Sequence, residues 1–564
     1  HNSAFDSYLF YSNAGGGFLH LNTADCTLTL SNSSGIDEHA WVVVEDVSLD
    51  VGNFTFVNLG TNAHLAVGQS QEQTVPARLT GAPENYTETW IPVRLEDGYY
   101  RFQIQINSGK LLKADGTALT VGTATDDSTK WTVKMDEQSG GYSLKNKSTG
   151  TILADINGTL SLVTEPELPN ASHLWKPVDF FALQAAPEDR VEFALHHLQS
   201  GKYLQYGSVF SSTSDGTLTA ESFNVVVDQT VVDSSQSYGY TAQTRAVCQR
   251  FTFEKVGTGD NAYYHILPYL RLRSESETTE IKGSYRSEYR LAVVNGAVKV
   301  MQTADGEDPA SGRWILQKTA GGKYRIFNAA ANKALTVENN TLMLTPGNAH
   351  ILWELKAISL AMEKDYQQYT NTCGLASARM ILRYLTGTDI TDLGWLQECQ
   401  RVIGSGYNFQ IASIASTMND LLGTGRHYSV TGGAKTSGSF QTMVSDSLNQ
   451  FYPLIVNNKP SEDVAQVEAL GYVSNGHYFV VKGLYYNEKE QRYDSVINET
   501  HYKFGEAPWG RYDSDTNTIE TLNRERVTDN IGGRDTVVEY SMLYTVYSQS
   551  NHGVMYMGKG GSNS

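Results

Sequence analysis

The first 360 residues repeat a unit of about 40 residues that reads as short strands closed by a tryptophan. The segment 98–136 shows the unit best, with alternating apolar and polar residues at 99–104, 109–114, 118–121 and 130–135. Ser-Gly, Asp-Gly and Asp-Asp turns separate these runs, so each run is predicted to be a strand. The tryptophans that close the first units are Trp41, Trp90, Trp131 and Trp175. Such repeats restrict this region to closed all-β architectures, a propeller or a trefoil.

The pattern resumes after Pro187 with larger insertions, in units that end near Phe251, Trp314 and Trp353. We therefore count seven units. The order Tyr-x-Ile/Phe, Gly-Lys-x-Leu, short strand, Trp-x-Val resembles the ricin-type β-trefoil, in which three units make one lobe. The resemblance implies two trefoils, one in the region 1–180 and one at 183–360. One extra unit remains, at 5–47 or at 141–180.

The sugar-binding motif of ricin-like lobes, Gln-x-Trp, is weak in this chain. The glutamine recurs once, as Gln249 before Phe251. We therefore expect the tryptophans to fill the barrel core, because large aromatic side chains pack well there. Loops on a rigid β scaffold are suited to recognition, so a glycan or cell-surface ligand of the trefoils is a hypothesis by analogy.

The charge of the chain limits its partners. The formal net charge is −18, which argues against nucleic acid as a partner, since nucleic-acid binding needs a concentrated basic face. No apolar run approaches the roughly 20 residues of a membrane span. The Asn-, Ser- and Tyr-rich composition favours a secreted, bacterial protein. The four cysteines contain no CxxC pair, so no metal and no cofactor are expected.

The region 361–564 changes to helical periodicity and predicts an α+β domain. Apolar residues after Cys373 line one face of a predicted helix, and further helices are predicted at 391–403, 409–422 and 439–451. Strand patterns then follow at 452–456, 477–484 and 493–498. The predicted fold class is thus multidomain, an all-β region followed by an α+β domain.

Reactive side chains occupy particular positions in this order. Cys373 opens the first helix, where unpaired N–H groups and the helix dipole favour a thiolate. His477 opens a strand after a Ser-Asn-Gly turn, and a predicted hairpin brings Asn498 beside it as an orienting amide. Gln367, in the loop before the helix, could stabilise an oxyanion, with Gln368 as the alternative.

These residues resemble a papain-like cysteine peptidase, most closely the double-glycine, bacteriocin-processing type. The resemblance rests on Gln-x5-Cys-Gly-x-Ala-Ser, an apolar helix, and Gly-His-Tyr-Phe-Val-Val-x-Gly with a hairpin. In that family an Asp followed by Pro takes the third position, whereas Asn498 is followed by Glu499 here. Glu499 and Asp494 are therefore alternatives to Asn498, and His501 is the best substitute for His477. Cys373 could also be a buried structural thiol, as we expect for Cys399.

The sequence thus predicts a secreted or cell-surface cysteine peptidase that hydrolyses a peptide or protein substrate through Cys373, His477, Asn498 and Gln367. Binding by the trefoils would direct this peptidase to its target. One alternative is a lectin-like or toxin-like binding protein whose papain-like domain is inactive. Another is an acyltransferase that uses the same residues to transfer the acyl group to an amine.

Overall fold

The computed structural model describes most of the repeat region and most of the helical region. The described residues are 11–12, 17–22, 27–31, 53–67, 75–80, 88–95, 98–105, 109–136, 138–181, 183, 186–187, 190–206, 210–211, 222–228, 249–259, 262–273, 280–285, 288–304, 306–339, 341–347, 350–362, 372–404, 410–423, 427–431, 436–458, 477–487, 492–498, 500, 511–513, 518–520, 535–548 and 553–557. Gln367, Gln368, Glu499, His501 and Trp41 lie outside this set.

The chain divides into two compact units, His1–Ser48 and Leu49–Ser564. The first unit contains an antiparallel sheet of β1 (Tyr11–Ser12), β2 (Gly17–Asn22) and β3 (Thr27–Ser31). The predicted unit at 5–47 is therefore separate from the repeats that follow it.

The second unit begins with a closed ring of strands. β4 pairs with β7, β7 with β8, β8 with β11, β11 with β12, β12 with β15, and β15 returns to β4. The strands of this region are β4 (Phe54–Asn58), β5 (His64–Val67), β6 (Val75–Thr80), β7 (Trp90–Arg94), β8 (Tyr100–Ile104), β9 (Leu111–Asp115), β10 (Ala118–Gly122), β11 (Trp131–Met135), β12 (Tyr142–Asn146), β13 (Thr151–Ile156), β14 (Thr159–Thr164) and β15 (Trp175–Asp179). The hairpins β5–β6, β9–β10 and β13–β14 add one pair to each third of the ring. The unit at 141–180 therefore belongs to this ring.

Each third of the ring repeats one hydrogen bond. The indole Nε1 of Trp90 donates to the Leu65 carbonyl, that of Trp131 to Leu112, and that of Trp175 to Leu153, at 2.9, 3.1 and 3.0 Å. All three rings are fully buried. This confirms that the tryptophans of the described units form the core.

A second ring has the same pairing order. β16 pairs with β20, then β21, β25, β26 and β29 follow, and β29 returns to β16. The strands are β16 (Val191–His197), β17 (Lys202–Tyr206), β18 (Phe210–Ser211), β19 (Ser222–Asp228), β20 (Phe251–Val256), β21 (Tyr263–Arg273), β22 (Glu280–Tyr285), β23 (Tyr289–Val294), β24 (Ala297–Gln302), β25 (Trp314–Lys318), β26 (Tyr324–Asn328), β27 (Lys333–Glu338), β28 (Thr341–Thr345) and β29 (Leu352–Leu360). Trp314 and Trp353 donate to the carbonyls of Leu291 and Leu335 at 2.7 and 2.9 Å. The domain limits at residues 180, 183 and 360 remain our proposal.

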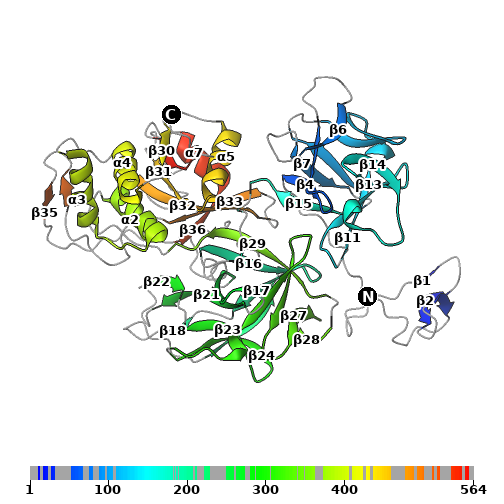
Figure 1. The fold of residues 1–564 in the computed structure, drawn as a ribbon, viewed down its shortest axis with the longest axis horizontal. Coiled ribbons are helices and arrows are strands. Elements are labelled where there is room, and N and C mark those ends of the chain that lie inside the picture. The colour runs from blue at the N-terminus through cyan, green and yellow to red at the C-terminus, as the bar shows by residue number, and fades with distance from the viewer. Residues whose placement is uncertain are drawn as a thin grey trace. The chain divides into compact units, whose positions relative to one another are not determined.

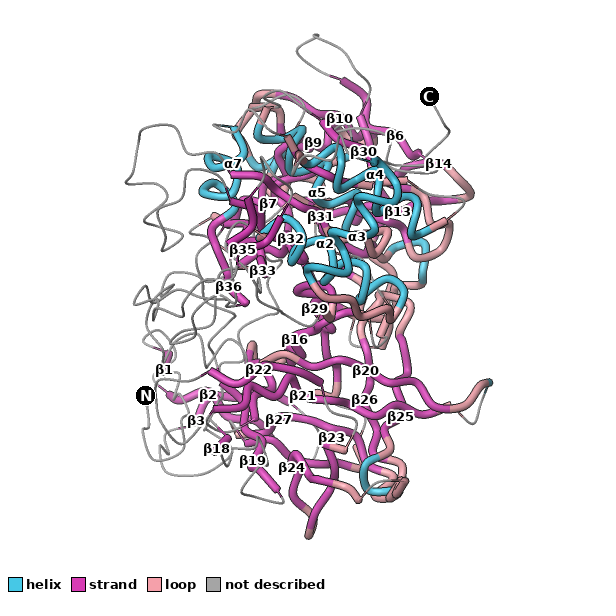
Figure 2. Tube along the Cα trace, turned by 90° about the vertical axis from the view of Figure 1, so that its left-hand side faces the viewer, coloured by secondary structure: helices cyan, strands magenta, loops and turns pink. Residues whose placement is uncertain are grey.

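The last region is built on a sheet with the strand order β30-β37-β31-β32-β33-β36. Its strands are β30 (Ser429–Thr431), β31 (Leu454–Asn458), β32 (His477–Asn487), β33 (Arg492–Asn498), β36 (Asp535–Glu539) and β37 (Val554–Tyr556), and β34 (Arg511–Asp513) pairs with β35 (Thr518–Glu520). Figure 1 shows α2, α3 and α4 grouped together, with α5 and α7 beside strands of this sheet. Helices are drawn in cyan in Figure 2 and are concentrated in this region, whereas strands make up the second ring. The predicted fold class, an all-β region followed by an α+β domain, is confirmed.

All four predicted helices form within about three residues of their expected limits. They are α2 (Cys373–Thr386), α3 (Asp392–Ile403), α4 (Ile411–Leu422) and α5 (Ser437–Leu448). The structure adds α7 (Tyr540–Ser548), which the sequence pattern did not predict. Among the described residues, no helix is long and apolar enough to cross a membrane.

Candidate active site

Cys373 is the first residue of α2 and is 7% exposed. The first intrahelical bond runs from the Ala376 N–H to the Thr372 carbonyl, at 2.9 Å. The N–H groups at the start of a helix have no partner within the helix, so they are directed at whatever lies before its first turn. The structure therefore places the thiol where backbone donors can stabilise negative charge.

A buried carboxylate fixes the beginning of α2. Asp392, the first residue of α3, accepts from Thr372 Oγ1 at 2.6 Å and from Arg379 Nε at 2.7 Å. Both Thr372 and Asp392 are fully buried, and Arg379 is nearly so. Because Asp392 contacts both the cap and the second turn of α2, it holds the helix start against α3. Sequence reasoning missed this anchor, since nothing in the local pattern pairs residues 372, 379 and 392.

Gly374 allows β32 and α4 to approach the cysteine closely. A Cβ at this position would lie 2.9 Å from Ile414 Cδ1 and 3.5 Å from the Tyr478 ring. Burial, together with the neighbouring Cys373 thiol, raises the pKa of the Tyr478 phenol. Tyr478 is therefore a side chain of β32 that lies beside the start of α2, and it stays protonated at neutral pH. The sequence pattern gives no signal for Tyr478, although Tyr478 directly follows His477.

His477 is the first residue of β32, is 3% exposed, and pairs with Asn458 of β31. Side chains along a strand alternate between its two faces. Since Tyr478 faces the start of α2, this alternation directs His477 toward the other face of the sheet. Within the described residues, no hydrogen bond joins Cys373 Sγ to the His477 imidazole.

Asn498 is the last residue of β33 and is fully buried. It pairs with Val480, and its amide nitrogen lies 3.9 Å from Met380 Sδ of α2. Asn498 therefore shares the sheet face of Val480 and Tyr478, whereas His477 has the opposite direction. Its Oδ1 is buried and makes no hydrogen bond with any described residue. The predicted hairpin forms from β32 and β33, and Asn498 lies at the end of β33 next to α2.

Other candidates also have defined positions. Asp494 accepts from Asn487 Nδ2 at 2.6 Å and from Arg492 Nε at 3.1 Å, and it pairs with Tyr485 near the turn of the hairpin. Asp494 is thus engaged far from His477, and the structure argues against it as the orienting group. Cys399 is fully buried in α3, as expected for a structural thiol.

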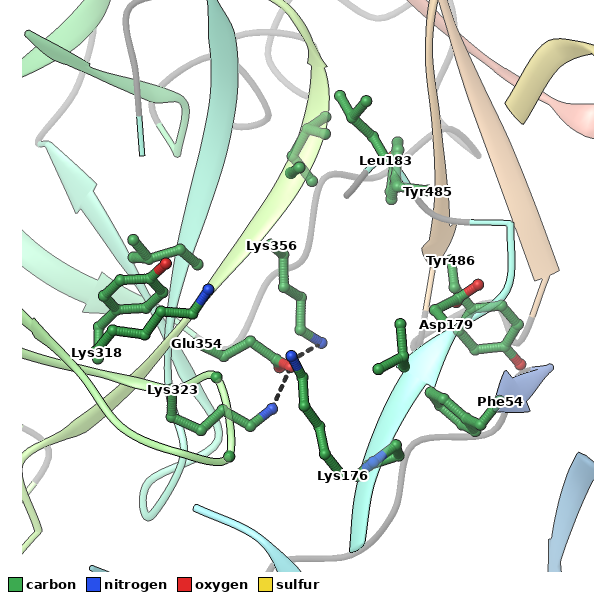
Figure 3. A pocket seen from close by; sticks show the side chains of 18 residues that line it. Phe54, Lys176, Asp179, Leu183, Lys318, Lys323, Glu354, Lys356, Tyr485 and Tyr486 are labelled. Atoms are coloured by element: carbon green, nitrogen blue, oxygen red, sulfur yellow. Dashed lines mark hydrogen bonds and ion pairs between the residues drawn. The ribbon is translucent and has the colours of Figure 1, made fainter. Parts of the chain in front are cut away.

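A separate cavity of about 180 Å³ lies elsewhere in the second unit. Figure 3 shows the ammonium groups of Lys176, Lys323 and Lys356 near the Glu354 carboxylate. Although burial opposes its ionisation, contacts with Lys323 at 2.5 Å and Lys356 at 3.5 Å hold the pKa of Glu354 well below its usual range. Burial lowers the pKa of Lys176, and the charges of Lys318 and Lys323 add to this. Neither Cys373 nor His477 lines this cavity.

One family model matches part of the chain. Residues 361–523 match the model of the Peptidase_C39 like family. That match includes Cys373, His477 and Asn498, and it extends over the α+β region rather than the repeats. No curated protein matches the chain.

Solved structures resemble parts of the chain at low identity. A designed 3-fold symmetric protein, ThreeFoil, is 20% identical and covers 23% of this chain and 99% of its own, with a TM-score of 0.21. SeviL bound to asialo-GM1 saccharide is 17% identical and covers 23% and 98%, with a TM-score of 0.20. A mosquitocidal holotoxin is 11% identical and covers 89% of this chain and 47% of its own, with a TM-score of 0.23. Scores this low add no argument, so the trefoil assignment depends on the pairing order of the two rings.

Proposed function

We propose that this protein is a secreted or cell-surface cysteine peptidase whose nucleophile is Cys373. The observation that carries the proposal is a buried thiol at the first residue of α2, inside a segment that matches a peptidase family. The substrate would be a peptide or protein, and the two rings of strands would bind a glycan or another cell-surface ligand.

The chemistry follows from the groups around the thiol. The Cys373 thiolate attacks the scissile carbonyl carbon and forms a C–S bond. The Cys373 N–H and the Gln367 amide stabilise the oxyanion. His477 gives its proton to the leaving amine as the C–N bond breaks, and water then hydrolyses the thioester with His477 as the base.

A catalytic pair of Cys373 and His477 forms only if the conformation of the first residues of β32 changes. Cys373 and His477 begin two elements that pack against each other, as the contact between Gly374 and Tyr478 shows. Catalytic hydrogen bonds are often long in the free enzyme and shorten when substrate binds. We therefore expect substrate binding to rearrange the backbone at the beginning of β32, so that the His477 imidazole reaches the sulfur. His477→Ala should lower kcat/KM by at least about 100-fold.

The third position is Asn498 in our proposal, and Glu499 is its rival. The buried Asn498 Oδ1 is free to accept an imidazole N–H, which favours Asn498. The pairing of Asn498 with Val480, however, places the Asn498 side chain on the sheet face opposite His477, which favours Glu499 as the orienting residue. Asn498→Leu removes an unsatisfied buried oxygen, so the variant should keep its stability whatever its activity. If Asn498 orients His477, this variant should lose most of kcat while Glu499→Gln keeps it, and the reverse result would assign the role to Glu499.

Labelling by an epoxysuccinyl peptide tests the nucleophile directly. Wild type should gain one inhibitor mass, Cys373→Ala should gain none, and Cys399→Ala should label like wild type because that thiol is fully buried in α3. Intact-mass spectrometry with peptide mapping identifies the labelled residue. Equal labelling of the Cys373→Ala variant would remove Cys373 from the mechanism.

A second candidate is a lectin-like or toxin-like binding protein whose peptidase-like region is inactive. It is favoured by Tyr478, which lies beside the start of α2, and by the strand alternation that directs His477 to the opposite face of the sheet. Glycan-array binding without cleavage of any member of a peptide library would support it. An acyltransferase would use the same thioester, and product masses in the presence of a primary amine distinguish transfer from hydrolysis.

A further inference from the structure

A buried ion pair joins the second ring of strands to the strand that begins with His477. Lys482 Nζ of β32 lies 3.0 Å from Glu192 Oε1 of β16, and both side chains are fully buried. The other carboxylate oxygen of Glu192 accepts from Arg250 Nη1 at 3.3 Å and from Ser359 Oγ. Burying a charge is costly unless it is paired and hydrogen-bonded. The carboxylate of Glu192 belongs to the second ring and the ammonium of Lys482 to β32, so this pair links the two regions.

The backbone of β32 also lies close to the backbone of β29 in the second ring. A Cβ on Gly483, the residue after Lys482, would collide with the Ile358 backbone oxygen and would lie 2.5 Å from Ser359 Cβ. The register of β32 against β33 shifts between Val481 and Gly483, so this is the point at which β32 departs from regular pairing. The bulge and the missing side chain together let β32 contact β29.

Apolar side chains from both regions share one cluster beside the ion pair. Ala194 of β16 and Ile358 of β29 pack with Tyr485 of β32 and Val496 of β33, and all four are buried. A packed interface of this kind does not separate without exposing apolar surface.

We propose that the second ring and the α+β region fold as one cooperative body, with Glu192 and Ser359 forming the docking site for Lys482 and Gly483. The second ring is then a structural partner of the peptidase-like region and is not a detachable ligand-binding module. Because β32 carries His477 five residues before Lys482, the ring also sets the position of that strand. The proposal holds whether or not the protein is a peptidase, and its tests measure stability alone.

A double-mutant cycle in the full-length chain tests the ion pair. Glu192→Gln removes this carboxylate from the buried Lys482 and should lower the melting temperature by about 4 to 6 °C. Lys482→Met leaves Glu192 with Arg250 and Ser359, so its loss should be about half as large. The double variant should lose less than the sum of the two losses, and Lys333→Met, at an exposed lysine of β27, should stay within about 2 °C of wild type. Additive losses would overturn the proposal, and so would an effect of Glu192→Gln no larger than that of Lys333→Met.

Hydrogen exchange tests cooperativity without changing any charge. In wild type, amides of β29 and β32 should lose protection at the same denaturant concentration. In Gly483→Ala, protection of β32 should be lost at a lower concentration than that of β29. The control is Gly347→Ala, whose Cβ would meet Thr345 Oγ1 at 3.4 Å and no other atom of the residues that the structure describes. Separate transitions for β29 and β32 in wild type would refute a single cooperative body.

Discussion

Gly374 and His197 show how single residues depend on their immediate surroundings. At Gly374 a methyl group would lie too close to Ile414, at 2.9 Å from its Cδ1, and in ordinary contact with the Tyr478 ring at 3.5 Å. His197 is fully buried, with Nε2 donating to the His350 carbonyl at 2.8 Å and Nδ1 accepting from Ser200 Oγ at 2.9 Å. The neutral imidazole satisfies both contacts, whereas protonation would remove the acceptor.

Gly374→Ala should destabilise the protein by about 1 kcal/mol, because the new methyl group forces the end of the buried Ile414 side chain to move. Gly374→Ala combined with Ile414→Val should recover part of this loss, since the clashing atom is the Cδ1 of Ile414. Urea unfolding of wild type, both single variants and the double variant measures the effect. A double variant that is as unstable as the sum of the singles would show that the constraint comes from another neighbour.

His197 should make the protein sensitive to acid. Burial lowers the pKa of His197 from 6.5 to about 4. The unfolded chain therefore binds a proton below about pH 6.5, whereas the folded chain resists protonation until about pH 4, so stability falls with pH across this window. The loss amounts to about 3 kcal/mol. His197→Gln should lose about 3 kcal/mol less than wild type between pH 7 and pH 4, and equal pH dependence of the two would contradict the assignment.

At the scale of elements, helices followed the sequence closely where an apolar face was clear. The expected helix after Cys373 forms as α2, and Gly387 ends it in a left-handed conformation. α7 was missed because Tyr and Val at 540–548 favour strands by local preference. Packing overrides this preference, since the Tyr547 ring stacks on Phe440 of α5 at 4.1 Å between centroids. The facing directions of His477 and Asn498 were not predictable either, because they depend on a register that the sequence pattern does not specify.

The start of α2 should depend on Asp392. Asp392→Asn removes the buried carboxylate charge that lies 2.7 Å from Arg379 Nε, so it should cost about 3 to 5 kcal/mol. The matched control is Asp389→Asn, an exposed residue whose contact with Arg383 is 3.7 Å long, and its cost should stay below about 1 kcal/mol. Chemical denaturation measures both. Similar costs for the two variants would show that Asp392 does not anchor the helix.

For the whole molecule, the two rings show how much of the strand order a sequence repeat predicts. The recurring turns and closing tryptophans specified the strands, and the pairing of β15 with β4 and of β29 with β16 closes each ring. The sequence left open which unit stood apart, because β1 to β3 carry the same local pattern as the ring strands. The contact between the second ring and β32 could not be predicted from the sequence either, since Glu192 and Lys482 lie 290 residues apart.

Because the first ring repeats one unit three times, we expect its three buried tryptophans to contribute equally to stability. Trp90, Trp131 and Trp175 are all fully buried, and each donates one hydrogen bond to a leucine carbonyl in its own unit. Replacement of any one by Phe leaves that carbonyl unsatisfied and removes the same atoms, so each variant should lose about 1 to 3 kcal/mol. The three losses should agree within about 0.5 kcal/mol by denaturant unfolding, a limit set by how well independent sites add. Glycan binding, where a glycan array detects any, should be unchanged, because fully buried rings cannot contact a ligand. A selective loss of glycan binding in one variant would show that its unit carries a ligand site, and the ring would then be a recognition element as well as a barrel core.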